Sequence, residues 1–273
     1  MTASSHVRGT ASRAADSKPL EYLARGGFIA YGVIHLIFAW IALQLAFGNS
    51  SAEGDQSGAF QNLASQPMGK TLVVITVIGM VGLALWQALE AAIGESGEQG
   101  KEAVANRVMS GIRAIIYLSF AWTGIRVLKG ANASTGDKQQ QSASGLMDNA
   151  GGRFLVGLIG VIVVGVGVGL VIYGLKKKFE KRLNTQQMKP AVLKTTRRLG
   201  VAGYTSKGVA FGIAGVLVVA AAVTYDPEKA RGLDAALKTL AGQPYGPWLL
   251  GLIALGIAAF GIYCFSQARY RKV

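Results

Sequence analysis

The sequence predicts an all-α integral membrane protein, with six transmembrane helices arranged as three tandem helical hairpins of approximate three-fold repeat symmetry about the membrane normal. Composition, unbroken apolar segments and an internal repeat support this fold class. Of the 273 residues, 51% are hydrophobic and only 15% are charged, whereas soluble domains are usually nearer a quarter charged. The apolar residues gather in six segments, at about 27–47, 71–93, 108–128, 154–175, 201–224 and 247–267.

Each segment has the length that a membrane crossing requires. A helix rising 1.5 Å per residue crosses the hydrocarbon core in roughly 20 residues. A backbone within lipid must satisfy its own polar groups, so a spanning segment is either a helix or a strand of a closed barrel. The apolar runs do not alternate with polar residues, which excludes barrel strands. The segments are therefore predicted to be helices.

An internal repeat organises the chain into three similar units. A motif that ends at Gly246 recurs in altered form at Gly69 and Gly152, and these glycines are 83 and then 94 residues apart. A second landmark, in the preceding apolar segments, falls at Gly32, Ala114 and Gly208, with steps of 82 and 94 residues. Independent landmarks with nearly equal steps indicate a true repeat. Each unit holds two crossings, so all three share one orientation.

Lys and Arg residues predict the orientation, because their excess in short loops marks the cytoplasmic side. They gather before the first apolar segment, after the second and fourth, and at the C-terminus. We expect a multi-pass protein of the bacterial cytoplasmic (inner) membrane with both termini in the cytoplasm. The predicted divisions are a disordered cytoplasmic tail (1–19), repeat 1 (20–97), repeat 2 (98–180), a basic cytoplasmic linker (181–198) and repeat 3 (199–273).

The net charge of +14 indicates attraction to anionic lipid rather than binding of nucleic acid. The basic residues lie at the ends of apolar segments, and no soluble domain is available to present them to a nucleic acid. Anionic lipid headgroups at the cytoplasmic face are the expected partners, with a membrane protein as a further possible partner. The basic linker is either ordinary stop-transfer charge or an amphipathic segment that binds lipid or a cytosolic protein.

Two further patterns concern packing. Leu233, Leu237 and Leu240 have helical spacing, which predicts a short helix on the outer surface. Glycines within the apolar segments, such as Gly165 and Gly169, predict close approach of neighbouring helices, since small residues allow backbones to touch.

Four ionisable residues lie inside the apolar segments: His35, Glu90, Arg113 and Lys207. Such residues are functional candidates because placing them in a membrane is costly unless they are solvated or paired. Arg113 and Lys207 occupy equivalent repeat positions, where repeat 1 has Tyr31. They either extend toward headgroups or form a ring that binds a lipid phosphate or another anion. Glu90 is expected near Arg113, as a structural ion pair rather than a proton relay.

His35 could be a metal or haem ligand, a proton carrier or a packed ring. The other histidine, His6, lies in the tail, and the repeat equivalents of His35 are Tyr117 and Phe211, so packing is favoured. The sequence has no metalloprotease, nucleophile-elbow, CxxC or phosphate-loop motif. We therefore expect no enzymatic activity, catalytic residues, cofactor or metal. The single cysteine, Cys264, is expected to behave as a small apolar residue.

The third repeat carries the clearest family pattern, written Tyr204-x-x-Lys207-Gly208-Val-x-Phe211 and then Leu240-Ala-x-Gln-Pro244-Tyr-Gly246-x-Trp248-Leu-Leu. This pattern resembles the domain-of-unknown-function family numbered 1206. The first copy retains Gln66-Pro67-x-Gly69, and the middle copy keeps Arg113, Tyr117 and Gly152 but lacks the proline. The resemblance implies a bacterial membrane protein with a two-helix domain present three times. It implies no activity.

The leading functional hypothesis is therefore a non-enzymatic accessory or scaffold subunit of the cytoplasmic membrane. One alternative is a small transporter or channel with a path between the hairpins. Another is an anionic-lipid-binding protein that uses a basic inner rim around Arg113 and Lys207.

Overall fold

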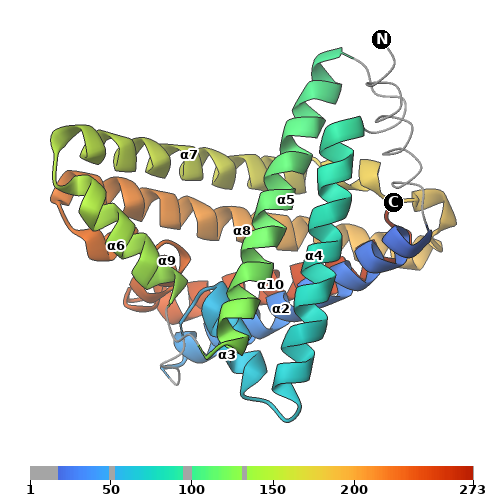
Figure 1. Cartoon of the computed structure of the whole chain (residues 1–273), viewed down its shortest axis with the longest axis horizontal. Coiled ribbons are helices and arrows are strands. Elements are labelled where there is room, and N and C mark those ends of the chain that lie inside the picture. Colours follow the sequence, from blue (N-terminus) through green and yellow to red (C-terminus); the bar gives the residue numbers. More distant parts are fainter. Residues whose placement is uncertain (1–17, 49–52, 95–99, 131–133, 273) are drawn as a thin grey trace.

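The computed structural model describes residues 18–48, 53–94, 100–130 and 134–272 (Figure 1). Within these ranges the regular elements are helices, and the one isolated β-bridge joins Leu183 to Arg271. The predicted disordered tail, 1–19, lies almost wholly outside the described residues, because the first helix begins at Lys18.

Six long helices correspond to the six predicted segments: α2 (Lys18–Ala46), α4 (Gly69–Ile93), α5 (Gly100–Leu128), α7 (Ala150–Leu175), α8 (Pro190–Thr224) and α10 (Gly246–Tyr270). All six are long and apolar enough to cross a membrane by length and composition. The range 181–198, predicted as a linker, includes the start of α8 at Pro190, where proline suits the first turn of a helix.

Three short helices lie together at one end of the bundle: α3 (Gln56–Ala64), α6 (Thr135–Met147) and α9 (Leu233–Ala241). Helix α9 confirms the short helix predicted from the leucine spacing. We call this the outer end, following the predicted orientation, and the end that carries the start of α2 and the end of α10 the inner end (Figure 1).

The turn into the second long helix of each repeat explains the glycine landmarks. A Cβ added at Gly69, Gly152 or Gly246 would overlap the carbonyl oxygen of the leucine six residues earlier. Only glycine allows so tight a return of the chain. The repeat seen in the sequence therefore records one turn geometry used three times.

Long helices pack mainly across repeat boundaries. Helix α4 packs along α5, α7 along α8, and α10 along α2, so each repeat's second helix meets the first helix of the next repeat in cyclic order (Figure 1). The contact of α10 with α2 and that of α7 with α8 use residues at equivalent repeat positions. A Cβ at Gly32 would meet the Gly261 carbonyl oxygen at 2.7 Å, and one at Gly208 would overlap that of Gly167. The glycine landmarks of the first helices are thus contact positions.

The middle repeat differs from the predicted hairpin. Helices α2 and α4 pack together, as do α8 and α10, whereas α5 and α7 hardly touch and cross at a steep angle in the view of Figure 1. The three tandem two-helix units are present, but the two helices of the middle unit do not pack on each other as those of the other two units do. Approximate three-fold symmetry about the membrane normal stays a prediction.

The glycines of α7 fall on two different faces. Gly160 and Gly167 are seven residues apart and contact α8 closely, as the spacing of a packed helix pair requires. Gly165 and Gly169 have open space where a Cβ would lie. The prediction that α7 packs closely on a neighbouring helix is therefore confirmed at Gly160 and Gly167, and it is wrong at Gly165 and Gly169.

The segment between α7 and α8 folds back across the inner end. It contains two short 3₁₀ turns, Lys178–Arg182 and Thr185–Gln187. Phe179, Leu183 and Met188 are buried, and the ring of Phe179 packs on Tyr204 and Tyr263. The apolar residues of this basic linker therefore belong to the core of the bundle.

Candidate functional site

Lys207 and His35, far apart in the sequence, meet in the interior of the bundle. The Lys207 Nζ atom lies 3.1 Å from His35 Nε2 and 3.3 Å from the Tyr31 hydroxyl. It also lies 3.9 Å from the centre of the Phe260 ring, where the ring's negative face attracts a cation. Lys207 thus points inward to α2 and α10, and the prediction that it extends toward headgroups is not supported by this geometry.

The hydrogen bonds of His35 determine where its ring carries hydrogen. Its Nδ1 atom lies 2.8 Å from the backbone carbonyl oxygen of Tyr31, which can only accept a hydrogen bond. Nδ1 therefore donates, and Nε2 is left to accept from Lys207. With 7% of its surface exposed, His35 is a neutral, packed ring that serves as a hydrogen-bond partner of Lys207.

Helix periodicity explains why this cluster forms. Tyr31 and His35 are four residues apart and so lie on one face of α2. The Tyr31 ring makes edge-on contacts with Tyr117 at 5.2 Å and Phe120 at 5.6 Å, both on α5. Tyr31, His35, Tyr117 and Lys207, which hold four of the equivalent repeat positions, therefore meet in the interior, and the Lys207 ammonium group lies against aromatic rings.

Arg113 and Glu90 are also close, but Gln87 lies between them. Arg113 Nη1 donates to Gln87 Oε1 at 3.3 Å, and Gln87 Nε2 donates to the Glu90 carboxylate. Ser110 Oγ donates to the same carboxylate at 3.0 Å. The expected direct ion pair between Arg113 and Glu90 is therefore replaced by a chain of hydrogen bonds through a buried amide.

Arg271 was not recognised from the sequence as part of a site. It has only 5% of its surface exposed, and its guanidinium group lies 4.7 Å from the centre of the Trp86 ring and 5.1 Å from that of Phe28. Its backbone is extended after α10 and pairs with Leu183. An arginine at a helix end usually indicates a solvated cytoplasmic charge, so no local signal marks this burial. We call Lys207, Arg113 and Arg271 the inner basic cluster.

A second polar cluster joins the three repeats at the outer end. The Asp55 carboxylate accepts from the backbone N–H of Gly136 at 2.9 Å, linking repeats 1 and 2. Asp137 pairs with Arg231 at 2.6 Å, linking repeats 2 and 3. Asp234 accepts from the backbone N–H of Gly54 at 2.9 Å and closes the circle. We call Asp55, Asp137, Arg231 and Asp234 the outer polar ring.

Glu53 borders the outer polar ring. Burial raises the pKa of its carboxyl group above the usual value, and the negative charges of Asp55 and Asp137 raise it further. A hydrogen bond from Ser134 acts in the opposite direction.

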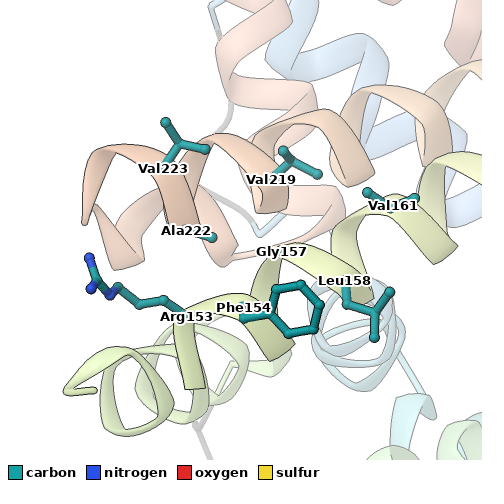
Figure 2. A pocket seen from close by; sticks show the side chains of 8 residues that line it. All are labelled: Arg153, Phe154, Gly157, Leu158, Val161, Val219, Ala222 and Val223. Carbon is teal, nitrogen blue, oxygen red and sulfur yellow. The ribbon is translucent and has the colours of Figure 1, made fainter. Parts of the chain in front are cut away.

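An apolar groove lies between α7 and α8 (Figure 2). It has a volume of about 370 Å³. Gly157 and Ala222 form its floor, and the larger side chains that line it are Phe154, Leu158, Val161, Val219 and Val223. At its outer end the Arg153 guanidinium group lies 4.1 Å from the centre of the Tyr225 ring. No group of three or more His, Cys, Asp or Glu side chains that could hold a metal is found in the described parts of the chain.

Fold and site define an all-helical protein of three tandem two-helix units, with six candidate membrane spans and a buried basic cluster. The chain belongs to the family described as Domain of Unknown Function (DUF1206), whose model matches residues 26–94, 108–177 and 202–271. The three matches begin 82 and 94 residues apart, as the sequence landmarks do.

The chain is also 28% identical over 260 residues to "Uncharacterized protein YxxB" of Bacillus subtilis (strain 168), covering 94% of each chain. No solved structure matches. Family membership thus confirms the three-copy architecture and assigns no activity.

Proposed function

We propose that this chain is a non-enzymatic accessory or scaffold subunit of the bacterial cytoplasmic membrane, with both termini in the cytoplasm. Its role is to bind a transmembrane helix of another membrane protein. The apolar groove between α7 and α8 is the observation that carries this proposal, because it lies on the least buried of the six candidate spans.

The chemistry of the groove suits a helix. Its floor is formed by the small residues Gly157 and Ala222, which allow a second backbone to approach closely. A Cβ at Gly157 would make only an ordinary contact, 3.6 Å from the Ala222 side chain, so the floor is open rather than filled. Branched aliphatic side chains on both walls offer packing, which drives helix association within lipid.

Cysteine crosslinking in native membranes tests the proposal. Cys264 is the sole cysteine and is fully buried, so a single introduced cysteine gives a site-specific reaction. Val161→Cys places the probe at the groove, with 58% of the native side chain exposed. The matched control is Ile78→Cys, at the equivalent position of repeat 1 with 54% exposed.

We expect one discrete protein adduct from Val161→Cys, absent from Ile78→Cys and abolished when Gly157→Leu fills the groove floor. Equal adducts from both positions, or an adduct that survives Gly157→Leu, would contradict the proposal. Membrane insertion is tested separately. Reporter tags that place the 176–182 segment and the C-terminus on opposite faces would contradict the predicted topology.

The transporter alternative receives no specific support. His35 and Lys207, which were candidates to line a path, are packed among the rings of Tyr31 and Phe260. The lipid-binding alternative has a specific observation in its favour, which concerns the inner basic cluster.

A further inference from the structure

The inner basic cluster contains more positive than negative charge. Ion pairs among the described residues involve Arg25, Arg197, Lys229, Arg231 and Lys238. None involves Lys207, Arg113 or Arg271 in those ranges. The Glu90 carboxylate accepts from Gln87 and Ser110, and Arg113 reaches it only through Gln87.

Arg271 is the clearest case of an unmatched cation. Its side chain is almost fully buried, and its Nε atom is buried without a hydrogen-bond partner. Stacking on Trp86 and Phe28 covers the faces of the guanidinium group but does not satisfy the N–H donor of Nε. A buried charge without an acceptor is strongly unfavourable. An acceptor from outside the chain would remove that penalty.

Arg113 on α5 and Arg271 after the end of α10 both contact the same turn of α4. Arg113 Nη1 donates to Gln87 Oε1 at 3.3 Å, the Arg271 guanidinium group lies 4.7 Å from the centre of the Trp86 ring, and Trp86 and Gln87 are consecutive residues of α4. The nearby Tyr263 hydroxyl is also buried without a partner. Guanidinium and hydroxyl donors therefore lie around one part of the core, which contains Trp86 and Tyr263, and such donors are the chemistry that recognises an oxyanion.

Two helices near the inner basic cluster leave faces that do not pack on each other. Helices α5 and α7 hardly touch, and α5 carries Arg113, which is partly exposed. Exposed apolar side chains lie on both helices, including Ile115 on α5 and Ile172 on α7. An amphiphile could place its acyl chains against these faces and its charged group at the cluster.

We propose that the inner basic cluster binds the phosphate group of an anionic membrane lipid between Arg113 and Arg271, and that the lipid enters between α5 and α7. This inference rests on the proposed membrane insertion but not on the partner helix, because the groove between α7 and α8 is lined by other residues. Lys207 contributes positive charge from the side of Tyr31 and His35.

Native mass spectrometry of the full chain in an uncharged detergent tests the proposal, with phosphatidylglycerol as the probe and phosphatidylcholine as the neutral comparison. We expect retention of phosphatidylglycerol by the wild type. Retention should weaken by about tenfold or more in Arg271→Gln and in Arg113→Gln, because each loses a charge-assisted pair. Arg269→Gln is the matched control, since Arg269 is exposed two residues from Arg271 and should retain lipid as the wild type does.

The rise in Tm on addition of lipid provides a second readout. Replacing an arginine with a purely structural role would lower the Tm but would not remove this rise. Phosphatidylglycerol should raise the Tm of the wild type and of Arg269→Gln, as any ligand of the folded state does, and should leave the Tm of Arg113→Gln unchanged. Since Arg113 is only partly buried, this variant tests the site even if Arg271→Gln does not fold.

Three results would overturn the proposal. Equal lipid retention by Arg113→Gln, Arg271→Gln and Arg269→Gln would remove the site. Displacement of the lipid by inorganic phosphate at equal concentration would show a site for a free oxyanion instead of a lipid. No retention of phosphatidylglycerol by the wild type, together with an intact Val161→Cys adduct, would reject this inference and leave the proposed function standing.

Discussion

Arg231 at the outer end and Arg271 at the inner end differ in how their positive charges are compensated within the chain. Arg231 has 23% of its side chain exposed and pairs with Asp137 at 2.6 Å and Asp234 at 3.2 Å. Arg271 is more deeply buried, and its guanidinium contacts are the rings of Trp86 and Phe28. The cation of the outer polar ring is paired with carboxylates of the same chain, whereas the cations of the inner basic cluster gain an anionic partner only if one is supplied from outside.

Charged groups also have different roles at the two ends of the bundle. Each carboxylate of the outer polar ring joins one repeat to another, so the ring closes the cyclic order of the helices. The inner basic cluster joins helices through aromatic rings and leaves donors unused. We therefore expect charged residues at the outer end to contribute mainly to the stability of the fold, and those at the inner end to contribute mainly to ligand binding.

The largest expected effect is at Asp234, the fully buried member of the outer polar ring. Asp234→Ala removes the acceptor of the Gly54 N–H and of two cations, Arg231 and Lys238. Breaking a buried pair by removing one partner costs about 3 kcal/mol. Thermal unfolding in detergent should show a large fall in Tm, and an unchanged Tm would show that the outer polar ring does not hold the repeats together.

Arg231→Met should destabilise by a smaller amount, about 2 kcal/mol, because Asp234 keeps Lys238 as a partner. The same measurement on Arg271→Met should give no loss, or a gain, in a detergent solution without anionic lipid, because an unmatched buried cation is replaced by an apolar side chain. Opposite signs for the two arginines are the sharpest test of the comparison. Equal losses would show that Arg271 is already satisfied within the chain.

A double-mutant cycle on His35→Phe and Lys207→Met tests whether these two residues act as one unit. Their contact is a single hydrogen bond of 3.1 Å, so a coupling free energy of about 1 kcal/mol is expected. His35→Phe introduces the residue found at the equivalent position of repeat 3, Phe211, and so keeps an aromatic ring at this place. Strict additivity of the two unfolding free energies would contradict the pairing.

The smallest expected effect is a pH dependence from Glu53. Because burial first, and neighbouring carboxylates second, raise its pKa in the folded state, the folded protein holds this proton more tightly than the unfolded chain. Glu53 therefore contributes most to stability at low pH, and that contribution falls as the pH rises from about 4 toward the raised pKa. Glu53→Gln should flatten this part of the profile of unfolding free energy against pH, and an identical slope in both proteins would contradict it.

The candidate site could be predicted only in part. His35, Glu90, Arg113 and Lys207 stand out because ionisable residues are rare in apolar segments, and the structure places them in two neighbouring groups. The side chains that these four residues contact were less predictable. Gln87 intervenes between Arg113 and Glu90, because which side chains meet between two helices depends on their relative rotation.

The amino-acid sequence by itself determined the number of long helices, the three-copy repeat and the glycines of the repeated turn, since these follow from local length, polarity and backbone geometry. Only the tertiary structure decided that α5 and α7 separate and that Arg271 turns back into the bundle. Contacts across repeat boundaries are made between residues far apart in the chain. Their geometry depends on how all the helices pack at once, which no local pattern records.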